Sequence, residues 1–309
     1  MGKALCAALL SVLSAIVAAF GLPTDWLDGA PPPPVETGVT VKVLDIGQGD
    51  SILIRTPEQT VLVDTGDTSE TRRLRAALKK AGVWRVDKLI VTHPHRDHIG
   101  GTATVFRECE VKEVFDNGQP TTTSVYREYL KTIQKKGIPS RTLRDGDVLD
   151  LGGGALLRVL SPTQEMVDER GMQNGKVNLN LNSLVARLEY GEFSMMLTGD
   201  AEAQSEMGIL KRHEPETLRC TLLKAGHHGS KTASVSAFLQ ALDADAALIS
   251  CGKDNEYHCP HPSVLVRYEK QEMDVYRTDR DGTITVRTDG KSYTIETERG
   301  EKADDGAKP

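Results

Sequence analysis

The sequence predicts an α/β sandwich in which two β-sheets lie face to face between outer layers of helices. Short apolar strands come in clusters with amphipathic helices between them, and both halves of the chain show this alternation. The folded unit expected over residues 39–297 is also long enough to bury one two-layered core. We therefore expect a four-layer αββα architecture for this unit.

The composition excludes several classes of protein. The chain has 309 residues, of which 39% are hydrophobic and 27% charged, so it is neither a polytopic membrane protein nor largely disordered. Its net charge of −6 excludes a wholly basic nucleic-acid-binding surface, although bound cations could supply positive charge locally. The five cysteines form no C-x-x-C pair. A bridge between Cys251 and Cys259 stays open, with free thiols favoured.

Both ends of the chain are expected to lie outside the folded unit. Residues 1–22 contain an uncharged apolar stretch after Lys3 and predict a signal peptide or a membrane anchor. Either alternative implies export, with the domain secreted or anchored outside the cytoplasm. Residues 23–38 include four consecutive prolines and predict a stiff linker. Residues 298–309 are polar and are expected to form a disordered tail.

In the first half of the chain, alternating β-branched residues predict strands, and amphipathic stretches predict helices. The expected strands are 39–46, 50–55, 60–64, 87–92, 111–115, 147–151 and 155–160. The expected helices are 69–81, a helix soon after the strand at 87–92, and 123–136.

The second half repeats the alternation of strands and helices. Residues 183–190 and 192–198 predict a hairpin that turns at Tyr190-Gly191. The other expected strands are 218–224, 245–250, 273–277, 282–287 and 292–297. The expected helices are 201–212, 232–241 and 262–271.

Seven of the eight histidines lie in three clusters, and the first cluster follows an apolar strand as H-P-H-R-D-H. On an extended turn, His93 and His95 can point the same way and share one metal ion. Asp97 and His98 then lie in the next turn and can bind a second metal ion nearby. Imidazole and carboxylate ligands suit Zn, and the carboxylate share also admits Mn or Fe. Four ligand-type residues in six positions favour a metal site over a solvated helix start.

Later motifs extend this constellation. Asp200 ends a strand in L-T-G-D and could bridge two metal ions, although the same residue could cap the helix expected at 201. His227 and His228 follow another strand, and we expect one of them to bind metal and the other to contact substrate. Asp64, in V-L-V-D-T-G-D, is expected to orient a histidine ligand or a loop.

Three further residues are candidates for substrate contacts. Ser230 and Lys231, with nearby backbone amides, could hold an anion at the start of the next helix. A helix-capping serine beside a solvated lysine explains them equally well. His261 opens a later helix and could protonate a leaving group or bind a phosphate oxygen. We interpret four other polar residues as turn or surface residues: Asp45, Gln48, Asp50 and His258.

The motifs together resemble the metallo-β-lactamase superfamily, because H-x-H-x-D-H, VDTG, TGD and HHGS occur in that family's order. More narrowly, LDIGQGDSILI, VTHPHRDHIGG and LLKAGHHGSKTAS resemble the C-terminal hydrolase domain of ComEC-type competence proteins. The match extends over about residues 39–290. The resemblance implies the metallo-β-lactamase form of the αββα sandwich and two divalent metal ions, Zn or Mn, as cofactors.

The resemblance also implies a role for each clustered side chain. One metal ion would be held by His93 and His95, the other by Asp97, His98 and His228, and both by a bridging Asp200. His227 and His261 would face the substrate.

One motif departs from the general superfamily. Many members carry a histidine before the hairpin as a further metal ligand, but N-L-N-L-N-S places Asn180 or Asn182 there. An amide oxygen is a weaker and harder ligand, so the first metal ion should bind less tightly or tolerate Mn. The ComEC-type proteins share this feature.

These features predict an exported hydrolase that uses a hydroxide held between two metal ions, and specifically a phosphodiesterase that acts as a DNA nuclease. Asp97 and Asp200 would orient the hydroxide, and His227, His261 and Lys231 would neutralise the developing negative charge. Two alternatives are an acyl hydrolase of the lactonase, thioesterase or β-lactamase kind and a non-catalytic binding domain. The expected partner is a phosphodiester such as DNA. Membrane contact is expected only through the N-terminal segment, and no obligate protein partner is evident.

Overall fold

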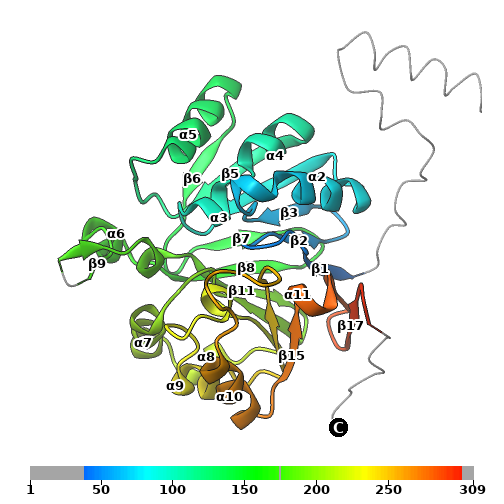
Figure 1. The fold of residues 1–309 in the computed structure, drawn as a ribbon, viewed down its shortest axis with the longest axis vertical. Coiled ribbons are helices and arrows are strands. Elements are labelled where there is room, and N and C mark those ends of the chain that lie inside the picture. The colour runs from blue at the N-terminus through cyan, green and yellow to red at the C-terminus, as the bar shows by residue number, and fades with distance from the viewer. Residues whose placement is uncertain (1–37, 174, 301–309) are drawn as a thin grey trace, which may run out of the picture. The chain divides into compact units, whose positions relative to one another are not determined.

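The computed structural model describes residues 38–173 and 175–300 and shows two facing β-sheets covered by helices (Figure 1). The expected signal or anchor segment and almost all of the linker fall in residues 1–37, outside the described residues. Within the described ranges, no helix is both long enough and apolar enough to cross a membrane.

The first sheet places four parallel strands, β3 to β6, beside an antiparallel group. Its eight strands follow the order β17-β16-β1-β2-β3-β4-β5-β6. Strands β3, β4 and β5 run parallel, so their carboxyl ends lie at one edge of the sheet. The bounds are β1 Val39–Val43, β2 Ile52–Arg55, β3 Thr60–Val63, β4 Arg85–Val91, β5 Glu110–Asp116, β6 Ser140–Thr142, β16 Ile284–Thr288 and β17 Tyr293–Thr297.

The second sheet has the same mixed character. Its seven strands follow the order β15-β14-β13-β12-β11-β8-β7. Strands β12 to β15 run parallel, and β11 and β12 form the predicted hairpin. The bounds are β7 Val148–Asp150, β8 Leu156–Ser161, β11 Val185–Tyr190, β12 Phe193–Leu197, β13 Leu222–Lys224, β14 Ala246–Ile249 and β15 Asp274–Arg277.

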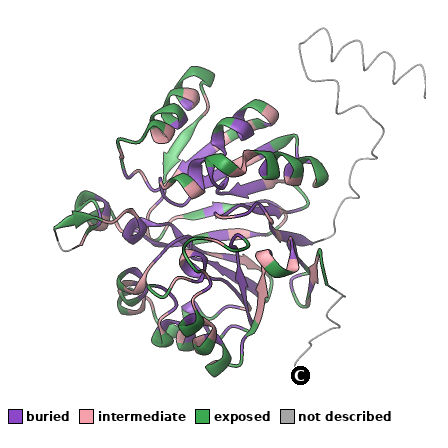
Figure 2. Ribbon diagram, in the orientation of Figure 1, coloured by how far each residue is buried: buried purple, intermediate pink, exposed green. Residues whose placement is uncertain are grey.

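Helices cover the outer face of each sheet (Figure 1). The first sheet carries α2 Thr71–Lys80, α4 Thr102–Glu108 and α5 Ser124–Lys136, and the second carries α7 Ala203–Arg212, α8 Pro215–Leu218, α9 Ser236–Leu242 and α10 Pro262–Lys270. One apolar cluster, which includes Val41 and Met195, fills the space between the sheets. Two further clusters join each sheet to its helices. Buried residues accordingly concentrate in the strands, and exposed ones on the helices (Figure 2). This confirms the predicted sandwich of two sheets.

Most of the strands and helices expected from the sequence are present, and the differences lie at their ends. The strand expected at 218–224 begins only at Leu222, because residues 215–218 form α8. The helix expected after β4 is two short helices, α3 Arg96–Ile99 and α4. The helix expected at 232–241 starts at Ser236. These local turns carry no periodicity long enough to be read from the sequence.

Several short elements were not predicted. They are the 3₁₀ turns η2 Thr68–Glu70, η3 Leu179–Asn182 and η4 Gly226–Gly229, the helices α6 Gln164–Asp168 and α11 Thr278–Asp281, strand β6, and the small hairpin of β9 Met172–Gln173 with β10 Lys176–Val177. Each is too short to show a helical or strand period.

The expected disordered tail is corrected at its beginning. Glu298 pairs with Lys80 and accepts a hydrogen bond from the backbone N–H of Thr283 at 3.0 Å, and Arg299 pairs with Asp45. These contacts hold the first tail residues on the domain. Residues 301–309 lie outside the described residues.

Candidate metal centre

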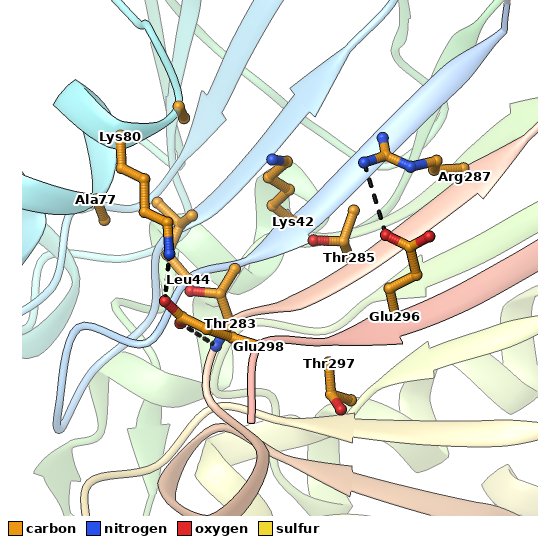
Figure 3. A pocket seen from close by; sticks show the side chains of 11 residues that line it. Lys42, Leu44, Ala77, Lys80, Thr283, Thr285, Arg287, Glu296, Thr297 and Glu298 are labelled. Carbon is orange, nitrogen blue, oxygen red and sulfur yellow. Dashed lines mark hydrogen bonds and ion pairs between the residues drawn. The ribbon is translucent and has the colours of Figure 1, made fainter. Parts of the chain in front are cut away.

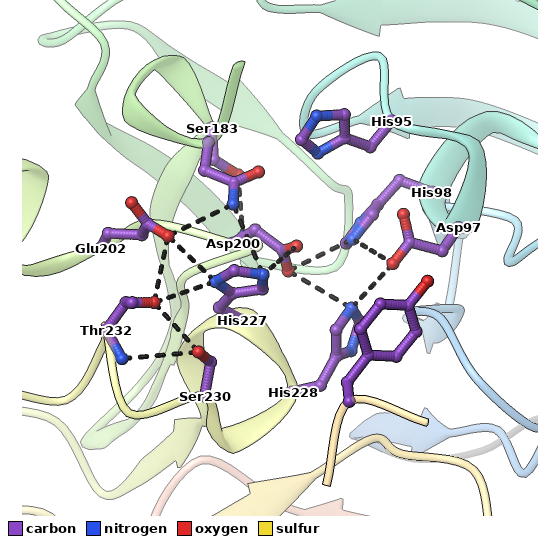
Figure 4. Close-up of polar contacts among 12 residues, drawn as sticks. His95, Asp97, His98, Ser183, Asp200, Glu202, His227, His228, Ser230 and Thr232 are labelled. Carbon is purple, nitrogen blue, oxygen red and sulfur yellow. Dashed lines mark hydrogen bonds and ion pairs between the residues drawn. The ribbon is translucent and has the colours of Figure 1, made fainter. Parts of the chain in front are cut away.

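The predicted metal-binding residues come together where parallel strands of both sheets end (Figure 4). His93 lies just after β4, Asp200 just after β12, and His228 just after β13. Asp200 lies 3.7 Å from the His93 ring and 3.5 Å from the His228 ring, measured between carboxylate oxygen and Nε2. Three segments far apart in the sequence therefore meet around one carboxylate.

The clustered side chains form two groups of potential ligands that share Asp200. The first group is Asp97, His98, Asp200 and His228, and the second is His93, His95 and Asp200. Within each group the potential ligand atoms lie within 4.8 Å of one another. This division is the one that the family resemblance implies, and a third group, Asp50, Asp64 and His98, does not include Asp200.

Two buried atoms at the centre fit a bound cation. His98 Nε2 and Asp200 Oδ1 lie 3.2 Å apart on side chains that are at most 2% exposed. Within the described residues, neither atom makes a hydrogen bond of acceptable geometry. The two atoms face each other as an ion pair without a hydrogen bond, and a divalent cation would satisfy both of them. The imidazole and carboxylate ligands present here suit zinc or manganese.

Asp64 fixes the orientation of His98. Its Oδ2 lies 2.7 Å from His98 Nδ1, and its Oδ1 accepts a hydrogen bond from the backbone N–H of Thr92 at 2.8 Å. Because Nδ1 is occupied by this contact, Nε2 is the nitrogen of His98 that can bind a metal ion at the centre. Asp64 adopts a φ of 58°, a left-handed conformation that is uncommon for a residue with a side chain. The structure thus places Asp64 beside a candidate histidine ligand, as the sequence predicts.

Asp50 has a role that the sequence analysis missed. We interpreted it as a turn residue, but its carboxylate lies 3.2 Å from His228 Nδ1 and 2.8 Å from the ammonium group of Lys224. All three side chains are buried. The signal in the sequence was a lysine at the end of an apolar strand, since a buried charge requires a partner.

His227 lies on the open side of the centre. Its side chain is 29% exposed, whereas that of His228 is 3% exposed. His227 Nε2 lies 3.7 Å from Asp200, and its Nδ1 lies 3.2 Å from Glu202. Glu202 is a second residue that sequence reasoning missed. His227 can therefore contact a bound substrate while Glu202 orients its ring.

The backbone of the HHGS turn explains how adjacent histidines serve one centre. Neighbouring residues on a strand face opposite ways. Here, His227 and His228 both adopt left-handed φ values, 48° and 54°, inside η4. The ring centroids are consequently 6.2 Å apart, and both rings approach Asp200. Such conformations store local strain, which the surrounding contacts must offset.

Asp200 does not cap a helix. The following helix α7 begins at Ala203 with Glu202 at its N-cap, so the capping alternative considered for Asp200 does not apply. The backbone N–H of Asp200 donates to the hydroxyl of Ser183 at 3.0 Å. The carboxylate is left to face the histidines.

The expectation for Asn182 is corrected. Its side-chain amide donates to the backbone carbonyl of Met166 at 3.0 Å, away from the histidines. Asn180 instead lies beside the centre, with its Nδ2 3.4 Å from His227 Nε2. The 3₁₀ turn of η3 separates these two residues, which a strand pattern would have placed on one face.

The structure shows the surroundings of two other predicted substrate contacts, His261 and Lys231. His261 Nδ1 accepts a hydrogen bond from the backbone N–H of Ser263 at 3.2 Å and so caps α10. Lys231 is exposed and precedes the next helix by several residues, so it does not lie at a helix N-terminus. Neither residue lines the cavity at the centre, whereas Ser230 does.

Carboxylates set the charge of the centre. Burial alone would lower the pKa of His98, but Asp200, Asp64 and Asp97 raise that pKa well above its ordinary value. Burial alone would raise the pKa of Asp200, yet His98 and His228 hold that pKa well below its ordinary value. Asp200 therefore stays ionised at neutral pH.

A cavity of about 450 Å³ opens onto this cluster. The metal-ligand candidates Asp97 and Asp200 line it together with His227. Gln48, Arg96 and Tyr257 are further lining residues. The cavity gives a ligand access to both ligand groups.

A second cavity, of about 390 Å³, lies beside α2 on the outer face of the first sheet (Figure 3). Two of its basic side chains contact carboxylates: Lys80 pairs with Glu298, and Arg287 lies 3.8 Å from Glu296. Among the described residues, none of those lining this cavity is a histidine or an aspartate. It offers no comparable ligand set.

The described cysteines do not form a disulfide. Cys251 is buried and Cys259 is partly buried, and both are free thiols. Among the described residues, the preference for free thiols is confirmed.

Comparison with known proteins identifies the family. Residues 44–253 match the metallo-beta-lactamase superfamily. The chain is 34% identical over 265 residues to ComE operon protein 3 of Bacillus subtilis (strain 168), covering 80% of this chain and 33% of that protein. It is 28% identical over 251 residues to competence protein ComA of Neisseria gonorrhoeae, covering 81% of this chain and 32% of that protein. The chain thus spans about a third of the length of these relatives.

The fold is also similar to a solved structure. Tm1679, described as a metal-dependent hydrolase of the beta-lactamase superfamily, superposes with a TM-score of 0.51 at 15% identity, covering 78% of this chain and 95% of that one. At this level of identity the likeness supports the fold. Sequence motifs, fold and relatives agree, and the chain belongs to the metallo-beta-lactamase superfamily and is related to competence proteins.

Proposed function

We propose that this protein is a metal-dependent hydrolase that cleaves phosphodiester bonds, with DNA as its polymer substrate. The observation that carries the proposal is the pair of ligand groups sharing Asp200, each with its potential ligand atoms within 4.8 Å of one another. Paired metal sites of this kind serve phosphodiester cleavage in many enzymes. Divalent ions bound by these residues would lower the pKa of a bound water and polarise a phosphoryl oxygen.

The protein's own residues would position the reactants. Asp97 and Asp200 line the cavity, and their carboxylates can accept hydrogen bonds from an attacking water. His227 is the more exposed histidine of its pair and can donate a hydrogen bond to a phosphoryl oxygen as negative charge develops. Asp64 and Asp50 hold the rings of His98 and His228 in place.

Similarity to competence proteins supports DNA as the substrate. The two relatives match over about 80% of this chain. The net charge of −6 does not oppose a phosphodiester substrate, because two divalent ions would add positive charge at the point of attack.

The proposal is tested by comparing full-length protein with the variants Asp97→Asn and Asp200→Asn. Both should lose hydrolysis of bis(p-nitrophenyl) phosphate and of labelled DNA by about 100-fold or more in the presence of Zn or Mn. The control is His213→Gln. His213 contacts Asp145 at 3.1 Å and belongs to neither ligand group, so this variant should keep full activity.

Three results would contradict the proposal. Undiminished phosphodiester cleavage by Asp200→Asn would show that the centre takes no part in the reaction. Turnover of nitrocefin or of a thioester without phosphodiester turnover would favour an acyl hydrolase. Wild-type protein that turns over neither kind of substrate would favour a binding domain.

A further inference from the structure

An exposed aromatic ring lies at the cavity that holds the metal-ligand candidates. Tyr257 lines this cavity and is 59% exposed. Among the large apolar and aromatic side chains that the described residues expose, Tyr257 alone lines it. A tyrosine ring in such a position offers a flat face on which a planar group can stack.

The loop that carries Tyr257 is held by its own hydrogen bonds. The Asn255 side-chain amide donates to the carbonyls of Gly252 and Cys259, at 2.9 and 2.6 Å, and its oxygen accepts from the Cys259 N–H at 3.0 Å. The Gln48 side chain accepts from the Gly252 N–H at 3.0 Å and ties the loop to a neighbouring turn. A ring presented by a braced loop loses little further entropy when a ligand binds.

Arg96 lines the same cavity, and a hydrogen bond holds one edge of its guanidinium group. Its side chain is 64% exposed, and its Nε donates to Asp67 at 2.7 Å. Among the described residues, this is the guanidinium's one hydrogen bond, which leaves both terminal amino groups for a ligand. Arginine in this state binds phosphate oxygens through two parallel hydrogen bonds.

A planar stacking face and a guanidinium beside a phosphodiester-cleaving centre match the alternation of base and phosphate in a nucleic-acid strand. Stacking of a base on an aromatic ring contributes about 1–3 kcal/mol and tolerates every base. A paired base is already stacked within the duplex and could not reach the ring without being unpaired. The ligand class indicated is therefore an unpaired nucleotide.

We propose that Tyr257 and Arg96 form a nucleotide-binding subsite, in which Tyr257 stacks on an unpaired base and Arg96 binds the adjacent phosphate. The inference rests on the proposed function and specifies its substrate as single-stranded DNA or frayed DNA ends.

Binding is measured by fluorescence anisotropy with a labelled phosphorothioate oligothymidylate, which resists cleavage, and the full-length protein. Tyr257→Ala should weaken binding by about 10-fold, the equivalent of about 1.4 kcal/mol of stacking. Tyr257→Phe keeps the ring and should bind as the wild type does. Trp84→Ala removes an aromatic ring of similar exposure, 61%, outside the cavity and should also leave binding unchanged.

An abasic strand with the same backbone separates stacking from phosphate binding. Tyr257→Ala and the wild type should bind it equally, whereas Arg96→Gln should weaken binding of both strands. The proposal is overturned if the wild type does not bind oligothymidylate, if Tyr257→Ala binds it normally, or if Tyr257→Phe loses as much affinity as Tyr257→Ala. Since this assay needs no turnover, loss of the subsite and failure of the phosphodiesterase proposal give different results.

Discussion

At the scale of single residues, the centre depends on buried charges that orient imidazole rings. Lys224 and Asp50 are almost completely buried and lie 2.8 Å apart, and Asp50 in turn contacts His228. Burial alone would raise the pKa of Asp50, but Lys224 and His228 lower it to about 2. The carboxylate is therefore ionised at neutral pH, and its lysine partner compensates the charge inside the fold.

Removing one partner of this pair should be costly. Lys224→Met should lower the free energy of unfolding by about 3–5 kcal/mol, because it leaves the charge of Asp50 buried and uncompensated. The double variant Lys224→Met/Asp50→Asn carries neither charge and should recover much of the loss. Urea denaturation at neutral pH measures both. A single variant as stable as the wild type would show that the pair does not hold this part of the fold.

At the scale of elements, the centre requires two turns to pack backbone against backbone. The turn after β3 donates the N–H of Thr65 to the carbonyl of His98 at 2.7 Å. A Cβ atom at Gly101 would lie 2.1 Å from the carbonyl oxygen of Thr65. The glycine pair that follows the histidine turn, Gly100 and Gly101, therefore permits the approach that brings Asp64 to His98.

Gly101→Ala should consequently destabilise the fold far more than the same change at a glycine that has free space for a Cβ atom. Gly101 has a φ of −86°, which alanine adopts freely, so its cost comes from the clash alone and should reach at least about 3 kcal/mol. Gly137 has a φ of 62° with no atom within 4 Å of an added Cβ, so Gly137→Ala should cost only about 1–2 kcal/mol. Thermal and urea unfolding compare the two. Equal losses would contradict the close packing of the two turns.

At the scale of the whole molecule, the sequence predicts the layers and most of the centre for identifiable reasons. Strand and helix periods mark the two sheets, and the clustering of His93, His95, Asp97 and His98 within six positions marks the ligands. The roles of residues whose placement depends on one local turn were harder to predict from the sequence. The role of Asp50 depends on its contact with Lys224, which lies in the second sheet. A 3₁₀ turn places Asn180, and not Asn182, beside the centre. The side chain of His261 caps its own helix.

The most direct test of the account is the metal content of the purified full-length protein. After equilibration with Zn or Mn and removal of free ions, elemental analysis should find about two divalent ions per chain, as the two ligand groups predict. Asp200→Asn removes the carboxylate that both groups share and should lower the occupancy of both sites. Wild-type protein that binds no divalent ion, or an Asp200→Asn variant that retains the full complement, would contradict the central claim.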